Sequence, residues 1–176
     1  MFSIKKSIDI LERTPFVVEE MLSGLDDEWI LVNEGGETWS AYDILGHLIH
    51  GEKTDWIARL QKVLSDSLDE KKFTPFDRFA QFNANKGKSL QQLLGEFKNL
   101  RAKNIIILQD KNIQDKDFGR TGFHPDFGNV TLRNLIATWV VHDLNHLAQI
   151  ARVMAYQYKD DVGPWKKYLR IVKETT

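Results

Sequence analysis

The sequence predicts an all-α protein: a four-helix bundle with a long crossover connection and a short C-terminal helix. Apolar residues recur at helical spacing in four long segments, and no segment alternates for long with the period of two typical of a strand. A polar stretch over residues 110–129 is long enough to be a crossover or a lid. The length of 176 residues fits a single domain, 1–176.

The first two helices are indicated by apolar spacing and by signals at their ends. Segment 3–22 has helical spacing, with Pro15 as a kink or break and Gly24 as a stop. Ser40, followed by Asp43, is typical of an N-cap, and it predicts a second helix over residues 41 to about 68. The apolar stripe of that helix consists of Ile44, Leu45, Leu48, Ile49, Trp56, Leu60 and Leu64.

The second half of the chain holds two more helices. The stretch Phe73–Phe82 has no clear period and is interpreted as a short helix or a packed loop, after which Ser89 caps a helix over 90–108. Thr131 caps the last long helix, from Leu132 to about Tyr158. That helix is apolar on most of its circumference, which predicts a place in the middle of the bundle. Gly163 and Pro164 end it, and a short terminal helix follows over 165–172.

The composition excludes several kinds of site and partner. The chain has no cysteine, so it has no disulfide, thiolate zinc site or cysteine nucleophile. Its net charge is −1 without a concentrated basic face, which argues against nucleic acid. The longest aliphatic run, Ile105–Leu108, is far too short for a membrane span, and residues 1–10 do not resemble a signal peptide. A cytoplasmic location is expected.

The last long helix carries the sequence His142-Asp143-Leu144-Asn145-His146. Residues four apart lie on one face of a helix, so the two imidazoles can converge on one metal ion. A chance pair is the alternative, but two imidazoles on an apolar helix are costly to bury unless their nitrogens are satisfied. Asp143 replaces the glutamate base of the zincin motif and points elsewhere, so we expect it to be a salt-bridge partner.

A third ligand is expected because two protein ligands rarely suffice. Residues alone leave His47 and His50 open, since both lie on the second helix. Gly51, one turn after His47, would leave room beside that imidazole, or it would serve close helix packing. His124, in the polar stretch, is expected to be an ordinary surface histidine.

Motifs in a fixed order along nearly the whole chain resemble the DinB-like (YfiT-type) superfamily. They are Trp39-Ser40, Ile44-Leu45-Gly46-His47-Leu48, Glu52, Thr131-Leu132-Arg133 and the run from Trp139 to Ile150. This superfamily also includes bacillithiol S-transferases and mycothiol-dependent maleylpyruvate isomerases, and many members are assigned as metal-dependent hydrolases without an established reaction. The resemblance implies a four-helix bundle with a three-histidine metal site, here His47, His142 and His146.

A three-histidine site adds no negative charge to its ion and leaves positions open for water or substrate. Zinc or nickel is expected first, with iron and manganese as alternatives. Two chemistries fit: hydrolysis of a small molecule, and transfer of a low-molecular-weight thiol whose carboxylates would need Arg59, Arg133 or Arg152. The alternative is a non-enzymatic, metal-stabilised bundle that binds a ligand or partner, and a homodimer is one assembly left open.

Two further polar residues are candidates for the site. Glu52 is interpreted as a catalytic carboxylate, either a base or a support for the ligands, against the alternative of an exposed helix glutamate. Gln149 shares the face of His146 and is interpreted as lining the pocket, against the alternative of a hydrogen-bonded core amide.

Overall fold

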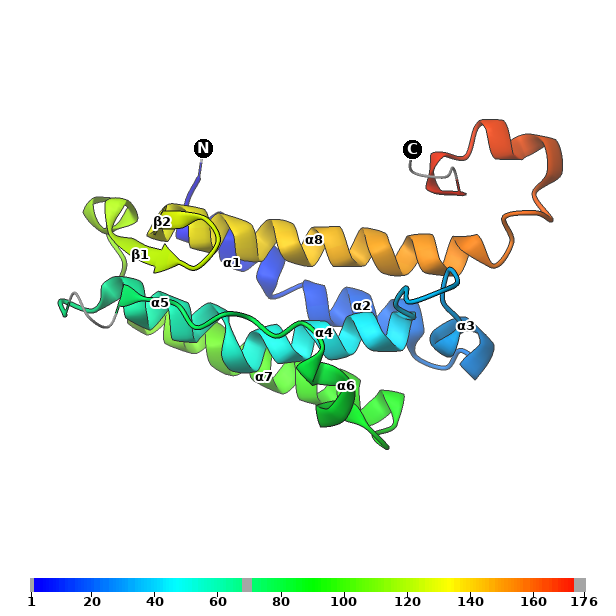
Figure 1. Cartoon of the computed structure of the whole chain (residues 1–176), viewed down its shortest axis with the longest axis horizontal. Coiled ribbons are helices and arrows are strands. Elements are labelled where there is room, and N and C mark those ends of the chain that lie inside the picture. Colours follow the sequence, from blue (N-terminus) through cyan, green and yellow to red (C-terminus); the bar gives the residue numbers. More distant parts are fainter. Residues whose placement is uncertain (1, 68–70, 173–176) are drawn as a thin grey trace.

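The structure is a computed structural model that describes residues 2–67 and 71–172, and these residues are mostly helical (Figure 1). Four helical columns form the bundle: α1 with α2, α4 with α5, α7 and α8. The all-α bundle is therefore confirmed in its main features. The long elements are α1 (Ile4–Leu11), α2 (Thr14–Leu22), α4 (Ala41–Thr54), α5 (Trp56–Leu64), α7 (Leu90–Asp110) and α8 (Leu132–Tyr156). The short ones are α3 (Asp27–Leu31), α6 (Ala80–Asn85), η2 (Asp115–Gly119), η3 (Gly163–Lys167) and η4 (Arg170–Val172).

The residues expected to begin or end helices lie at helix ends in the structure. Ser40, Ser89 and Thr131 each accept a hydrogen bond from the third backbone N–H of their helix and complete a capping box. Pro15 stands in the first turn of α2, where its missing N–H costs no hydrogen bond, and the expected break precedes it. Gly24 adopts a φ of +79°, a conformation that other residues rarely adopt.

The second predicted helix is wrong as a single element. It is interrupted at Asp55, whose φ and ψ are −114° and −73°, and α5 ends at Leu64; the predicted end at Leu68 lies outside the described residues. No glycine or proline marks this break, so apolar spacing alone did not reveal it. The stretch 73–82 contains both predicted alternatives: residues 73–79 form an irregular loop, and residues 80–82 are the start of the short helix α6.

The crossover contains regular structure that the sequence did not predict. After η2, strands β1 (Thr121–His124) and β2 (Gly128–Thr131) pair antiparallel, with Thr121 opposite Thr131. Gly122 of β1 lies so close to the Phe73 ring that a Cβ there would overlap it. The hairpin therefore packs against the loop after α5 and leads directly into α8 (Figure 1). The short terminal helix predicted over residues 165–172 is divided in the structure into two 3-10 helices, η3 and η4.

The last long helix, α8, is not buried on all sides. This corrects the expectation that it lies in the middle of the bundle. Val141 and Leu144 are 62% and 46% exposed. Its buried stripe instead includes Asp143 and His146 among aliphatic and aromatic neighbours. Two apolar clusters form the core, one around Trp56 and Trp139 and the other around α4, α7 and the end of α8. The packed side of α8 therefore contains the polar side chains of Asp143 and His146 as well as apolar ones.

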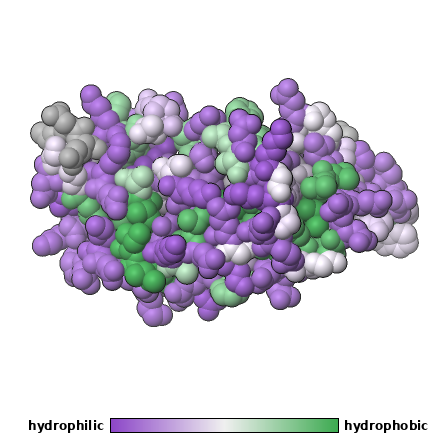
Figure 2. All heavy atoms as spheres, turned by 90° about the horizontal axis from the view of Figure 1, so that it is seen from below, coloured by the Kyte–Doolittle hydropathy of each residue, from purple (hydrophilic) through white to green (hydrophobic). Residues whose placement is uncertain are grey.

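The surface carries no continuous apolar belt on the face shown in Figure 2, where hydrophilic residues surround separate apolar patches. Among the helices of residues 2–67 and 71–172, none is long and apolar enough to cross a membrane.

Candidate metal centre

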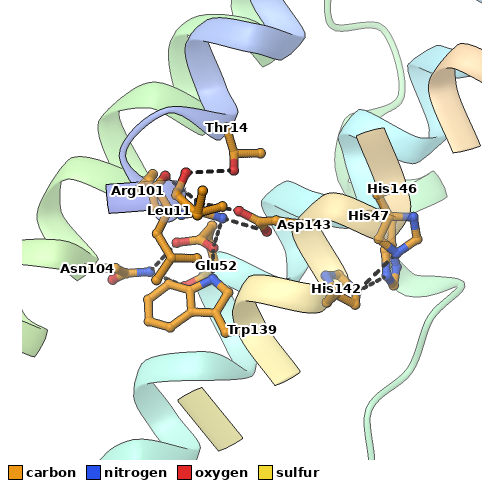
Figure 3. A network of polar contacts seen from close by, with 11 residues as sticks. Leu11, Thr14, His47, Glu52, Arg101, Asn104, Trp139, His142, Asp143 and His146 are labelled. Atoms are coloured by element: carbon orange, nitrogen blue, oxygen red, sulfur yellow. Dashed lines mark hydrogen bonds and ion pairs between the residues drawn. The ribbon is translucent and has the colours of Figure 1, made fainter. Parts of the chain in front are cut away.

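Three histidines from two helices meet in the interior. His47 of α4 and His142 and His146 of α8 place one ligand atom each within 4.8 Å of one another. The Nε2 atom of His142 lies 3.0 Å from that of His47 and 3.1 Å from that of His146 (Figure 3). The structure therefore brings together the three residues that the resemblance implied.

Burial keeps these imidazoles neutral. Desolvation, with smaller repulsions from neighbouring histidines, lowers the pKa of His47 to about 3 and that of His142 to about 2. The pKa of His146 is lowered as well, by desolvation first, while its hydrogen bond to Gln149 opposes the shift. A neutral imidazole has a free lone pair, so the trio is in the form that a metal ion needs at neutral pH.

Hydrogen bonding fixes which nitrogen of His146 is free. Its Nδ1–H donates to Oε1 of Gln149 at 2.7 Å, which leaves the Nε2 lone pair directed at the other two rings. The Nδ1 atoms of His47 and His142 are buried without a partner among the described residues. The three Nε2 atoms converge, but the contacts between them do not each hold a proton that the two nitrogens could share. Their lone pairs are therefore poorly satisfied, and a cation between the three nitrogens would satisfy them. Three neutral nitrogens suit zinc, nickel or iron.

The other two histidines stay outside the cluster. His50 packs against the Phe76 ring, with centroids 4.9 Å apart, and His124 stacks on Phe127 at 4.5 Å. Gly51 does not make room for His47, contrary to the first interpretation. A Cβ at Gly51 would instead lie 3.1 Å from the indole nitrogen of Trp56.

Glu52 lies behind the cluster and not on its open side. It is 3% exposed, which excludes the exposed-glutamate alternative. Its Oε1 accepts hydrogen bonds from Nη2 of Arg101 at 2.8 Å and from Nε1 of Trp139 at 3.0 Å, and its Oε2 accepts one from Nδ2 of Asn104 at 2.9 Å. Both oxygens are therefore engaged with protein donors.

Asp143 is a salt-bridge partner, as its position beside His142 led us to expect. Arg101, 1% exposed, donates from Nη1 to its Oδ2 at 2.5 Å and from Nη2 to its Oδ1 at 3.0 Å. Arg101 also donates to the carbonyl of Leu11 at 2.7 Å, so the guanidinium joins α1, α4, α7 and α8 (Figure 3). Sequence reasoning missed Arg101, although its position one turn after Phe97 places it on the buried stripe of α7.

A cavity of about 480 Å3 opens beside the three histidines. Besides the histidines it is lined by Glu34, Glu37, Thr38, Trp39, Arg78, Phe79, Gln149 and Arg152. Gln149 thus lines the pocket and orients a histidine at once. Arg152 is held by two hydrogen bonds to Glu34, at 2.9 and 2.7 Å, whereas Arg78 has no ion pair with any described residue.

Two of the three arginines considered from the sequence lie elsewhere. Arg59 pairs with Asp55, and Arg133 lies over the Phe2 and Phe118 rings. Arg78, which no motif indicated, takes a place on the cavity wall instead.

Comparisons with known proteins show the family and the fold of the chain. The family model of the DinB superfamily matches residues 10–150. No curated protein sequence matches the chain. Among solved structures, the chain is similar to YfiT from Bacillus subtilis, described as a probable metal-dependent hydrolase with an unusual four-helix bundle topology. The two share 19% sequence identity over 93% of this chain and 91% of that one, with a TM-score of 0.72, so the likeness concerns the fold.

Proposed function

The chain belongs to the DinB superfamily, and on that premise we propose that it is a metal-dependent enzyme with His47, His142 and His146 as ligands. The observation that carries the proposal is the convergence of three neutral imidazoles, two buried and one half-buried, beside a cavity. Zinc or nickel is the first expectation for the ion, and iron or manganese the second.

The donor set suits Lewis-acid chemistry. Three neutral ligands leave the full charge on the ion, and three protein ligands leave coordination positions for a substrate or water. Glu52 does not supply a fourth ligand, because its oxygens are engaged with Arg101, Asn104 and Trp139. An open site of this kind favours an enzyme over the alternative of a bundle that uses metal only for stability.

The cavity favours a small-molecule substrate, and two reactions fit it. Hydrolysis is the first, in line with the description of YfiT. Transfer of a low-molecular-weight thiol is the second, because a chain without cysteine would take its nucleophile from the substrate. Arg78 lines the cavity and is free of ion pairs within the described part of the chain, which supports the proposal that it binds a carboxylate of the substrate.

The test begins with metal binding. The single substitutions His47→Ala, His142→Ala and His146→Ala should each abolish stoichiometric zinc or nickel binding and the rise in melting temperature that the ion gives the parent. His50→Ala and His124→Ala are matched controls, because both histidines lie outside the cluster, and both variants should bind as the parent does.

Activity is then screened with the metal-loaded parent, using ester and amide substrates and, separately, thiols with electrophilic acceptors. Turnover that is lost in His142→Ala supports the enzyme. Metal binding that survives all three alanine substitutions refutes the site, and metal binding without any turnover across both screens favours the non-enzymatic bundle.

A further inference from the structure

The buried network behind the histidines does not balance its own charge. Arg101 contributes one positive charge, and Glu52 and Asp143 contribute one negative charge each, so the network carries one negative charge in excess. The remaining charged side chain in the buried set of residues 2–67 and 71–172 is Asp55, which has its own partner in Arg59.

Hydrogen bonding indicates that both carboxyl groups of the network are ionised. Each of the four oxygens accepts a bond from a protein donor: Arg101 and Trp139 donate to one Glu52 oxygen, Asn104 to the other, and Arg101 to both Asp143 oxygens. None of these contacts offers an acceptor to a carboxyl proton. An unbalanced charge in a protein interior is costly, so it needs a counter-ion nearby.

The network and the histidine cluster are direct neighbours. Asp143 follows His142 on α8, and Figure 3 shows its side chain between Arg101 and the histidines. On a second path, the Trp139 indole that donates to Glu52 stacks on Trp56 with ring centroids 5.7 Å apart. Trp56 in turn meets the His142 ring edge-to-face at 5.1 Å.

We infer that this network is the buried counter-charge of the metal ion: its excess negative charge stabilises a cation held by three ligands that contribute none. The inference rests on the proposed metal site. Glu52 is then a residue that acts on the ion through space, and it is neither a ligand nor a base. Because a Coulomb interaction is proportional to the charge of the ion, the network must favour divalent over monovalent ions.

The experiment measures the affinity of the full-length protein for Zn2+ and, under anaerobic reducing conditions, for Cu+, by competition with chromophoric chelators. Glu52→Gln keeps the shape of the side chain and removes its charge. It should weaken Zn2+ binding by about tenfold or more, and the loss for Cu+, on a logarithmic scale, should be about half as large. Asp143→Asn should show the same ratio, which guards against a folding defect peculiar to one variant.

Glu19→Gln is the matched control, since it removes the same charge from a surface pair with Lys98 and should change neither affinity. Equal losses for Zn2+ and Cu+ would mean that the substitutions misplace the histidines, which overturns the counter-charge. Unchanged Zn2+ affinity in both variants overturns it as well. If the parent binds neither ion, the metal site itself is wrong, and this outcome is separate from the other two.

Discussion

The metal-free protein should lose stability steeply on mild acidification. In the unfolded chain each histidine titrates near its ordinary pKa of 6.5, whereas the folded structure lowers the pKa of His47 to about 3 and that of His142 to about 2. Between pH 6.5 and these lower values, the unfolded chain binds protons at His47 and His142 that the folded protein does not bind. Stability is therefore complete above pH 6.5 and falls as the pH drops from 6.5 towards 3.

The size of the effect follows from the same two values. At pH 5.5 a histidine with an unfolded pKa of 6.5 binds nearly one more proton when unfolded, which costs about 1.4 kcal/mol. The two residues together should therefore lower the free energy of unfolding by about 3 kcal/mol between pH 7.5 and pH 5.5. That loss is a large part of the roughly 5–15 kcal/mol of an ordinary domain.

Urea denaturation in the presence of a chelator, at pH 7.5 and pH 5.5, measures the loss. The comparison with His142→Gln isolates one histidine, because the carboxylates that also titrate are common to both proteins. The variant should lose about 1.4 kcal/mol less than the parent over this range. Equal losses in the two proteins would show that His142 protonates freely in the folded state, which contradicts the burial described above.

Three further predictions concern single side chains. Arg101→Leu leaves two buried carboxylates without their cation, so it should cost about 3–5 kcal/mol in urea denaturation; a loss below about 1 kcal/mol would contradict the ionised network. Gln149→Ala removes the acceptor that orients one imidazole and should weaken metal affinity by about 10–100-fold in a chelator competition, and unchanged affinity would deny it that role. Gly122→Ala forces a methyl group into the Phe73 ring and should cost about 1–3 kcal/mol by the same denaturation assay. Gly119→Ala, which meets no atom within 4 Å, should be nearly neutral, and equal costs for the two would contradict the packing of the hairpin.

Local sequence signals predicted the helices well where the interacting residues lie close together in the sequence. Ser40, Ser89 and Thr131 cap their helices through bonds to residues three positions away, so a short stretch of sequence holds all the needed information. No local signal marked the break at Asp55, and the hairpin depends on a partner far along the chain. Gly122, for example, is required by contact with Phe73, which apolar spacing does not report.

The metal site was likewise predictable only where a local sequence pattern indicates it. Spacing alone paired His142 with His146, but the choice between His47 and His50 needed the family resemblance, because both lie on one helix. Arg101 had a readable signal, a charged residue on the apolar stripe of α7. Arg78 had none: it stands in an irregular loop, and only the folded chain brings that loop to the cavity.

The two helices that supply the histidines are distant in sequence, and this distance has a kinetic consequence. His47 and His142 are separated by 95 positions, so the pocket for the ion exists only after α4 and α8 have docked. An ion that needs all three ligands has little to bind in the folding transition state, if docking of α8 comes late. It then leaves the folding rate almost unchanged and slows unfolding instead. Loaded protein would persist through brief exposure to heat or protease, because it opens rarely and not because it refolds faster.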